Sequence, residues 1–167
     1  MFKFSNYEKI LFSVPDISPT KILRIHGYKN KNKIKPKIFE AANKAIERLF
    51  YNSSPEGFFF ATKIKKRSSN NIILQCGTIL NCEIFNERLP KSNYLVVFIL
   101  TLGKGIDDEL RKISDELDEP LGAIFLENAS WLALELIIRE ARLKVIKFAY
   151  SKNLEIENRM APGNYYP

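Results

Sequence analysis

The end of the chain, "ENRMAPGNYYP" (157–167), contains residue types well suited to holding a small polar ligand. Arg159 carries a planar guanidinium, which can bind a carboxylate through two parallel charged hydrogen bonds. Pro162 fixes its own φ and biases Ala161 toward an extended backbone, and Gly163 lets the backbone approach a flat ligand closely. This order of residues could hold an amino acid headgroup together with a purine. An ordinary surface turn is the alternative explanation.

A second candidate is Glu135, a carboxylate inside the apolar helical run "WLALELIIRE". A buried carboxylate is costly unless another group pairs with it. Arg139 follows four residues later, at a spacing that brings two side chains together on a helix, so an ion pair within the helix is one explanation. A ligand that offers a cation or an amine to Glu135 is the other.

The remaining patterns that could carry chemistry favour structural roles. In "TLGKG", three acidic residues follow at the same helix end and would repel a phosphate, so we expect a tight turn that needs Gly103 and Gly105 for backbone reasons. The single histidine, His26, precedes a glycine near a helix end and is expected to cap or to pack. The sequence contains only two cysteines, Cys76 and Cys82, and one histidine, which argues against a zinc site. The sequence therefore predicts neither a catalytic residue nor a metal site.

The net charge of +7 raises the question of a nucleic-acid partner. The lysines gather in "KNKNKIKPK" (29–37) and "KIKKR" (63–67), beside turns, without a recognition helix or an RNA-binding signature. We therefore expect no nucleic-acid binding, while an acidic protein partner would use the same charge. No uninterrupted apolar stretch of about 18 residues occurs. We expect a soluble, cytoplasmic protein with one domain over residues 1–167.

The first part of the chain predicts two helices and then paired strands. Pro19 precedes a short helical pattern, "TKILRIHGY", which Gly27 ends. Pro36 opens a longer helix over "KIFEAANKAIERLF", whose apolar residues recur at helical spacing. The runs "FFFATKIKK", "IILQC" and "TILNC" are separated by turn residues and predict antiparallel strands.

The later part predicts one more strand and three helices. "EIFNERL" is a short helix, and "NYLVVFILT" (93–101) is an unbroken apolar run, which predicts a central strand buried on both faces. "IDDELRKISDEL" predicts a helix with acidic residues in its first turn. A long helix follows from Leu121 to about Lys152, and residues 131–138 are apolar on nearly every side, which predicts a position between two layers. Without regular βαβ alternation, the class is α+β.

The run "RMAPGN" resembles the R-x-x-P-G-Y loop of the activation domain of cobalamin-dependent methionine synthase. The likeness extends over nearly the whole chain. "KILRIHGYKNK" is similar to the family's leucine-arginine…Gly-Tyr-Lys segment, and a helix matching "PKIFEAANKAIERL" follows it. "YLVVFILTLGKGIDDELRK" is similar to the family's strand, Thr-x-Gly turn and helix, and the long helix leads into the loop in the same order. The resemblance implies a curved antiparallel sheet packed with helices, including one long C-terminal helix.

In that family the domain binds S-adenosylmethionine and closes over cobalamin held by a separate domain. A flavodoxin-type or ferredoxin-type donor reduces cob(II)alamin, and S-adenosylmethionine methylates it, which restores methionine biosynthesis. By resemblance, Arg159 holds the ligand carboxylate, and the backbone around Pro162, at Ala161 and Gly163, meets the adenosine. Glu135 corresponds to the family's helix carboxylate at the methionine end.

By the same resemblance, Asp16 in "VPDISP" is a candidate for the family's N-terminal aspartate. Asn164 stands where the family has tyrosine, and Tyr165, one position later, is the remaining candidate for that contact. The chain ends at Pro167, where family members continue with more helix and strand, so we expect a C-terminally short form. The D-x-H-x-x-G signature of cobalamin-carrying domains does not occur, so a partner must bring the corrinoid.

Two hypotheses follow. The first is a module that binds S-adenosylmethionine and reactivates a methionine synthase or another corrinoid protein by methyl transfer to cobalamin. The second is a non-catalytic interaction protein that kept the fold and lost the ligand, for which the expected short C-terminus and Asn164 in place of tyrosine are the motivation.

Overall fold

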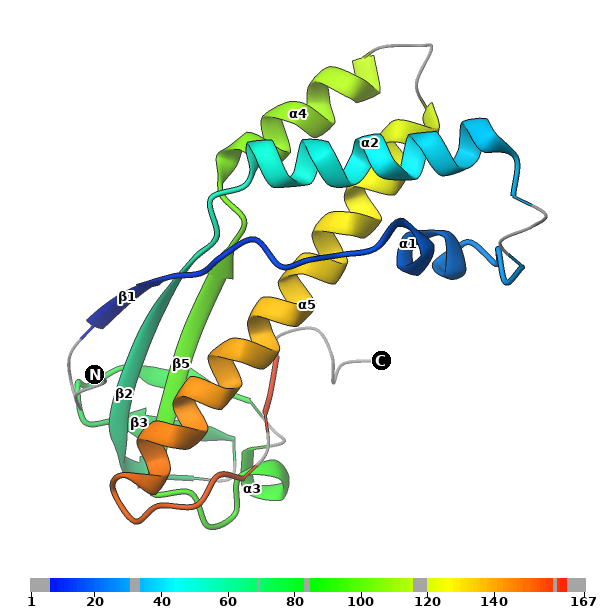
Figure 1. The fold of residues 1–167 in the computed structure, drawn as a ribbon. Coiled ribbons are helices and arrows are strands. Elements are labelled where there is room, and N and C mark those ends of the chain that lie inside the picture. The colour runs from blue at the N-terminus through cyan, green and yellow to red at the C-terminus, as the bar shows by residue number, and fades with distance from the viewer. Residues whose placement is uncertain are drawn as a thin grey trace. The chain divides into compact units, whose positions relative to one another are not determined.

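The structure, a computed structural model, describes residues 7–30, 34–68, 70–82, 85–115, 120–157 and 159–161. These residues form an α+β fold, as predicted, with five strands and five helices (Figure 1). In chain order they are β1 (Tyr7–Leu11), α1 (Pro19–Ile25), α2 (Pro36–Asn52), β2 (Glu56–Arg67), β3 (Asn71–Leu74), β4 (Ile79–Asn81), α3 (Phe85–Arg88), β5 (Tyr94–Thr101), α4 (Lys104–Asp115) and α5 (Pro120–Tyr150).

The chain divides into two compact units. The first, here called the sheet unit, comprises Met1–Glu8, Phe58–Phe98 and Arg142–Pro167. The second, the helical unit, comprises Lys9–Gly57 and Ile99–Ala141. In the sheet unit Lys and Arg number 12 and Asp and Glu number 5, whereas each group numbers 14 in the helical unit. The sheet unit therefore carries the whole net charge of +7.

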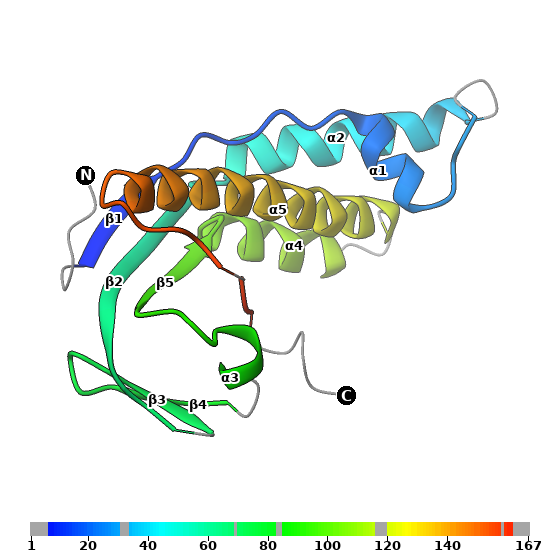
Figure 2. The same ribbon diagram turned by 90° about the horizontal axis from the view of Figure 1, so that it is seen from below.

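The sheet is antiparallel and is organised around β2. Its strand order is β1-β2-β3-β4, and β5 also pairs with β2. The register between β2 and β3 shifts by one residue, because Ile64 lies opposite Leu74 whereas Lys66 lies opposite Ile73. The bulge at Lys65 bends its strand and increases the local twist. Figure 2 shows β2 curving toward the β3–β4 hairpin, as the family resemblance implied.

The prediction that the strand at 93–101 is central and buried on both faces was wrong. Among the described strands β5 pairs with β2, and β2 is the strand with several neighbours. From Val96 onward the side chains of β5 alternate between half-buried and exposed, and Val97 is 38% and Ile99 69% exposed. A continuous apolar run establishes that one face is covered, but it does not require a second layer over the other face.

Local signals position the helices of the helical unit as predicted. Pro36 opens α2 as predicted, whereas Pro19, which was expected to precede the helix, is itself the first residue of α1. At both positions the missing N–H removes no intrahelical hydrogen bond. His26 caps the end of α1 and packs edge-on against Phe125, and Gly27 follows with φ 82°. The α2 helix packs against α1 and α4 (Figure 1). Its apolar stripe is buried at Ala42, Ala45 and Leu49.

The long helix α5 has one fully buried stripe. Its members recur every three or four residues: Phe125, Leu126, Ala129, Ala133, Ile137 and Ala141. Trp131 is 56% exposed, so the prediction that residues 131–138 lie between two layers was wrong for this side chain. Among the described helices, α5 is long and apolar enough to cross a membrane, since an 18-residue window has mean hydropathy 1.6 with 39% of it buried. Core helices also meet this criterion.

The strand-to-helix turn between β5 and α4 needs both of its glycines, as predicted. Gly103 has φ 90°, and a Cβ atom there would meet the Oγ of Ser54. Gly105 lies in the first turn of α4, where a Cβ atom would meet the backbone carbonyl oxygen of Asn52. The backbone of Ser54 donates to the Leu102 carbonyl at 2.7 Å, which holds the end of α2 close to this turn.

Gly105→Ala is expected to destabilise the protein by about 1–3 kcal/mol, because the added methyl group overlaps a backbone atom that has no side-chain freedom. The sign of this change in the free energy of unfolding distinguishes the site from an ordinary helix position. There, replacing glycine with alanine stabilises the protein by about 1 kcal/mol. Urea unfolding measures the effect. Ser114→Ala, at an exposed position of the same helix, is the control and should be neutral or slightly stabilising. Increased stability of Gly105→Ala would contradict the close contact.

Candidate functional site

A defined helix end redirects the chain toward the predicted ligand segment. Asn153 has φ 54°, and its N–H donates to the Tyr150 carbonyl at 3.1 Å while the N–H of Leu154 donates to the Ala149 carbonyl at 3.0 Å. This pair of bonds is a Schellman motif with asparagine in the left-handed position, which reverses the chain after α5. In Figure 2 the segment then runs toward α3.

The segment that follows is held to the sheet unit at two points. The Ser92 hydroxyl donates a hydrogen bond to Oε2 of Glu157. Three residues later, Met160 packs against a buried apolar cluster formed by Ile72, Leu74, Phe85 and Leu89. Arg159 lies between these two points and its side chain is exposed, whereas Ala161 is half-buried. The predicted carboxylate-binding guanidinium therefore stands on a segment that is anchored on both sides.

The loop that carries Ser92 is itself fixed by Arg67, the last residue of β2. The guanidinium of Arg67 donates to the Leu89 carbonyl and, at 2.6 Å, to the Ser92 carbonyl. One planar group thus binds two carbonyl oxygens of the connection between α3 and β5. Nothing in the sequence indicated Arg67, Ser92 or Glu157, because these residues are far apart along the chain.

Of the other predicted ligand residues, Pro162, Gly163 and Tyr165 lie outside the described residues. Glu135 is half-buried in the part of α5 that belongs to the helical unit. Within the described part of the chain it forms no ion pair with Arg139, so the first of the two explanations given for Glu135 does not hold. A half-buried carboxylate keeps contact with water, which removes most of the need for a partner.

Asp16 is exposed and lines a small pocket of the helical unit. The pocket is mainly apolar and has a volume of about 150 Å³. Sites that enclose small molecules usually have volumes of about 300–1,000 Å³. This pocket alone is therefore too small to enclose a nucleoside with an amino acid attached, and Glu135 does not line it.

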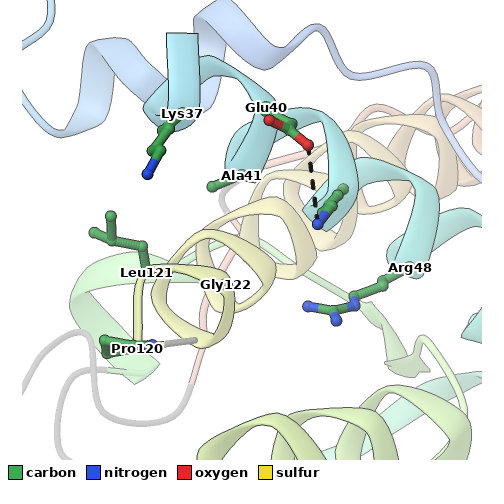
Figure 3. Close-up of a pocket in the computed structure, with 8 residues that line it drawn as sticks. Lys37, Glu40, Ala41, Arg48, Pro120, Leu121 and Gly122 are labelled. Atoms are coloured by element: carbon green, nitrogen blue, oxygen red, sulfur yellow. Dashed lines mark ion pairs between the residues drawn. The ribbon is translucent and has the colours of Figure 1, made fainter. Parts of the chain in front are cut away.

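A larger pocket of about 470 Å³ lies between α2 and the start of α5 in the helical unit (Figure 3). Its charged lining comes from one face of α2 and consists of Lys37, Glu40, Lys44 and Arg48. Glu40 and Lys44 approach to 4.0 Å, and Arg48 forms an ion pair with Glu109 at 3.3 Å. Sequence reasoning missed this pocket, although the recurrence of charges every three or four residues could have indicated the face.

The turn between β3 and β4 holds an exposed cysteine. The sulfur of Cys76 lies 3.3 Å from Oγ1 of Thr78, and hydrogen bonds from the Thr78 side chain and then its backbone lower the pKa of this thiol. Among the described residues no group of three or more His, Cys, Asp and Glu could hold a metal ion.

Comparison with known proteins finds similarity among solved structures. No family model matches the chain, and no curated protein matches it. A crystal structure of the MetH reactivation domain bound to AdoHcy aligns with 92% of this chain at a TM-score of 0.63 and 14% sequence identity. The fold is similar to that of the MetH reactivation domain. The chain spans 59% of the length of that solved chain.

At 14% identity, the likeness to the MetH reactivation domain concerns the fold. It agrees with the order of motifs in the sequence, and the curved antiparallel sheet and the long helix are both present. The MetH reactivation domain in that structure binds AdoHcy. The ligand residues assigned above to this chain, Arg159 first among them, stay predictions.

Because its pKa is lowered, the Cys76 thiol should be alkylated by iodoacetamide at lower pH than an ordinary cysteine, since the thiolate is the reacting form. The rate is measured against pH in Cys82→Ser, which leaves one cysteine. Thr78→Val removes the hydroxyl and should move the midpoint of the profile to higher pH. Identical midpoints with and without the Thr78 hydroxyl would contradict the assigned cause.

Proposed function

We propose that this chain is an S-adenosylmethionine-binding module for the reductive reactivation of cob(II)alamin on a partner methionine synthase or another corrinoid protein. The observation that carries the proposal is the similarity of the fold to the MetH reactivation domain bound to AdoHcy. AdoHcy is S-adenosylhomocysteine, the molecule that S-adenosylmethionine becomes after it gives up its methyl group. The order of the motifs along the chain supports the same proposal.

In this proposal Arg159 binds the carboxylate of S-adenosylmethionine through a charged, bidentate interaction. Two observations support this role: Arg159 is an exposed residue, and Glu157 and Met160 on either side of it are anchored. The backbones of Ala161 and Gly163, beside Pro162, would contact the adenosine. S-adenosylmethionine supplies an electrophilic methyl group, and the residues of this chain bind and orient it.

Further ligand contacts are proposed from Glu135, toward the ammonium of the methionine end, and from Asp16 and Tyr165. The corrinoid is a substrate that the partner protein brings, and an electron donor of the flavodoxin or ferredoxin type reduces it. The concentration of positive charge in the sheet unit supports an acidic protein partner. We place this activity in the cytoplasm.

Calorimetric titration of the full chain with S-adenosylmethionine tests the proposal. Loss of a charged hydrogen bond costs about 1.5–3 kcal/mol, so Arg159→Ala is expected to weaken binding at least about tenfold. Arg142→Ala, an exposed arginine on α5, removes the same charge elsewhere and should bind as the wild-type protein does.

If Arg159→Ala and Arg142→Ala weaken S-adenosylmethionine binding equally, the effect comes from the overall charge of the protein. That result would contradict a specific role for Arg159. Absence of heat for the wild-type protein at millimolar ligand would reject the binding function. That outcome would favour the second hypothesis, a non-catalytic interaction protein, for which Asn164 in place of the family tyrosine is the supporting observation.

A further inference from the structure

We propose that Arg67, Ser92 and Glu157 are positioning residues that hold the Arg159 segment in place before a ligand arrives. The inference deepens the proposed function and rests on it as far as binding of S-adenosylmethionine is concerned. The part of the inference that concerns the position of the segment depends only on contacts within the sheet unit.

The segment needs such contacts because it has no regular secondary structure. The Schellman motif fixes the chain as far as Leu154. Beyond it, the described residues 155–157 and 159–161 belong to neither a helix nor a strand, so no hydrogen-bond ladder determines their place. Side-chain contacts must therefore orient Arg159.

The Ser92–Glu157 hydrogen bond provides the first of these contacts. Its acceptor is a carboxylate, and hydrogen bonds to an ionised group are roughly twice as strong as those between neutral groups. Both side chains are half-buried, which limits competition from water. Glu157 lies two residues before Arg159, so its anchoring restricts the backbone from which the guanidinium projects.

Arg67 fixes the other partner of this bond. Because one guanidinium holds the carbonyls of Leu89 and Ser92, the backbone between them keeps a single conformation, and the Ser92 hydroxyl is presented to Glu157. The chain of contacts thus runs from β2 through the α3–β5 connection to the ligand segment. On the far side of Arg159, Met160 provides the second, apolar contact.

An ordered segment favours binding, since the ligand then does not have to offset the entropy of ordering it. We expect Ser92→Ala and Glu157→Ala each to weaken binding of S-adenosylmethionine about tenfold in calorimetric titration. Glu155→Ala is the matched control, because Glu155 is an exposed carboxylate of the same segment and its loss changes the charge equally. It should leave the affinity unchanged.

A second measurement needs no ligand. Trypsin cleaves after arginine, so the initial rate of cleavage after Arg159, followed by mass spectrometry, reports how firmly the segment is held. Ser92→Ala and Glu157→Ala should raise this rate several-fold while the melting temperature stays close to that of the wild-type protein, and Glu155→Ala should not raise it. The double variant should match the single variants, because the two residues share one bond.

The two measurements separate the two proposals. Unchanged cleavage in Ser92→Ala and Glu157→Ala would overturn the positioning role, whatever the affinities. Faster cleavage after Arg159 with unchanged affinity for S-adenosylmethionine would show that these residues hold the segment but do not contribute to ligand binding. That result would also overturn the inference. Absence of binding by the wild-type protein would reject the proposed function, and cleavage alone would then decide whether these residues hold the segment. Arg67→Lys, which keeps the charge but loses the planar fork, should increase cleavage as well.

Discussion

The guanidinium of Arg67 connects the parts of the sheet unit that the chain itself separates. It extends from the end of β2 and binds two carbonyl oxygens of the connection between α3 and β5. That connection then offers the Ser92 hydroxyl to Glu157, beyond the end of α5. An arginine suits this place because its donors form a rigid plane that can bind two carbonyl oxygens at once. Leu89, whose carbonyl Arg67 binds, also belongs to the apolar cluster against which Met160 packs.

The helical unit obtains its order in a different way, through close backbone contact. Gly103 and Gly105 bring the turn before α4 against the end of α2, at distances that no side chain could tolerate. The ion pair between Arg48 and Glu109 joins the same two helices. The glycines that resembled a phosphate-binding loop in the sequence therefore serve packing, and the acidic start of α4 is consistent with that role.

Signals that act over a few residues were sufficient to predict most of the secondary structure. Pro19, Pro36 and Gly27 set helix ends because their backbone preferences do not depend on the rest of the fold. Properties that depend on distant contacts were predicted poorly. The apolar composition of β5 did not reveal that one of its faces is exposed.

In the candidate site too, features set by neighbouring residues were predicted from the sequence, whereas contacts between residues far apart along the chain were not. Arg159 was proposed as a ligand residue from the types and order of its neighbours, whereas the contacts that hold its segment were not predicted from the sequence. Ser92 and Glu157 are separated by 65 positions, and a single serine or glutamate carries no signal of such a pairing.

The most direct test of the account is a crystal structure of the full chain with S-adenosylmethionine. We expect the carboxylate of the ligand to lie within hydrogen-bond distance of the Arg159 guanidinium, with Glu157 still bound to Ser92. A ligand bound elsewhere, or a structure without ligand at saturating concentration, would contradict it.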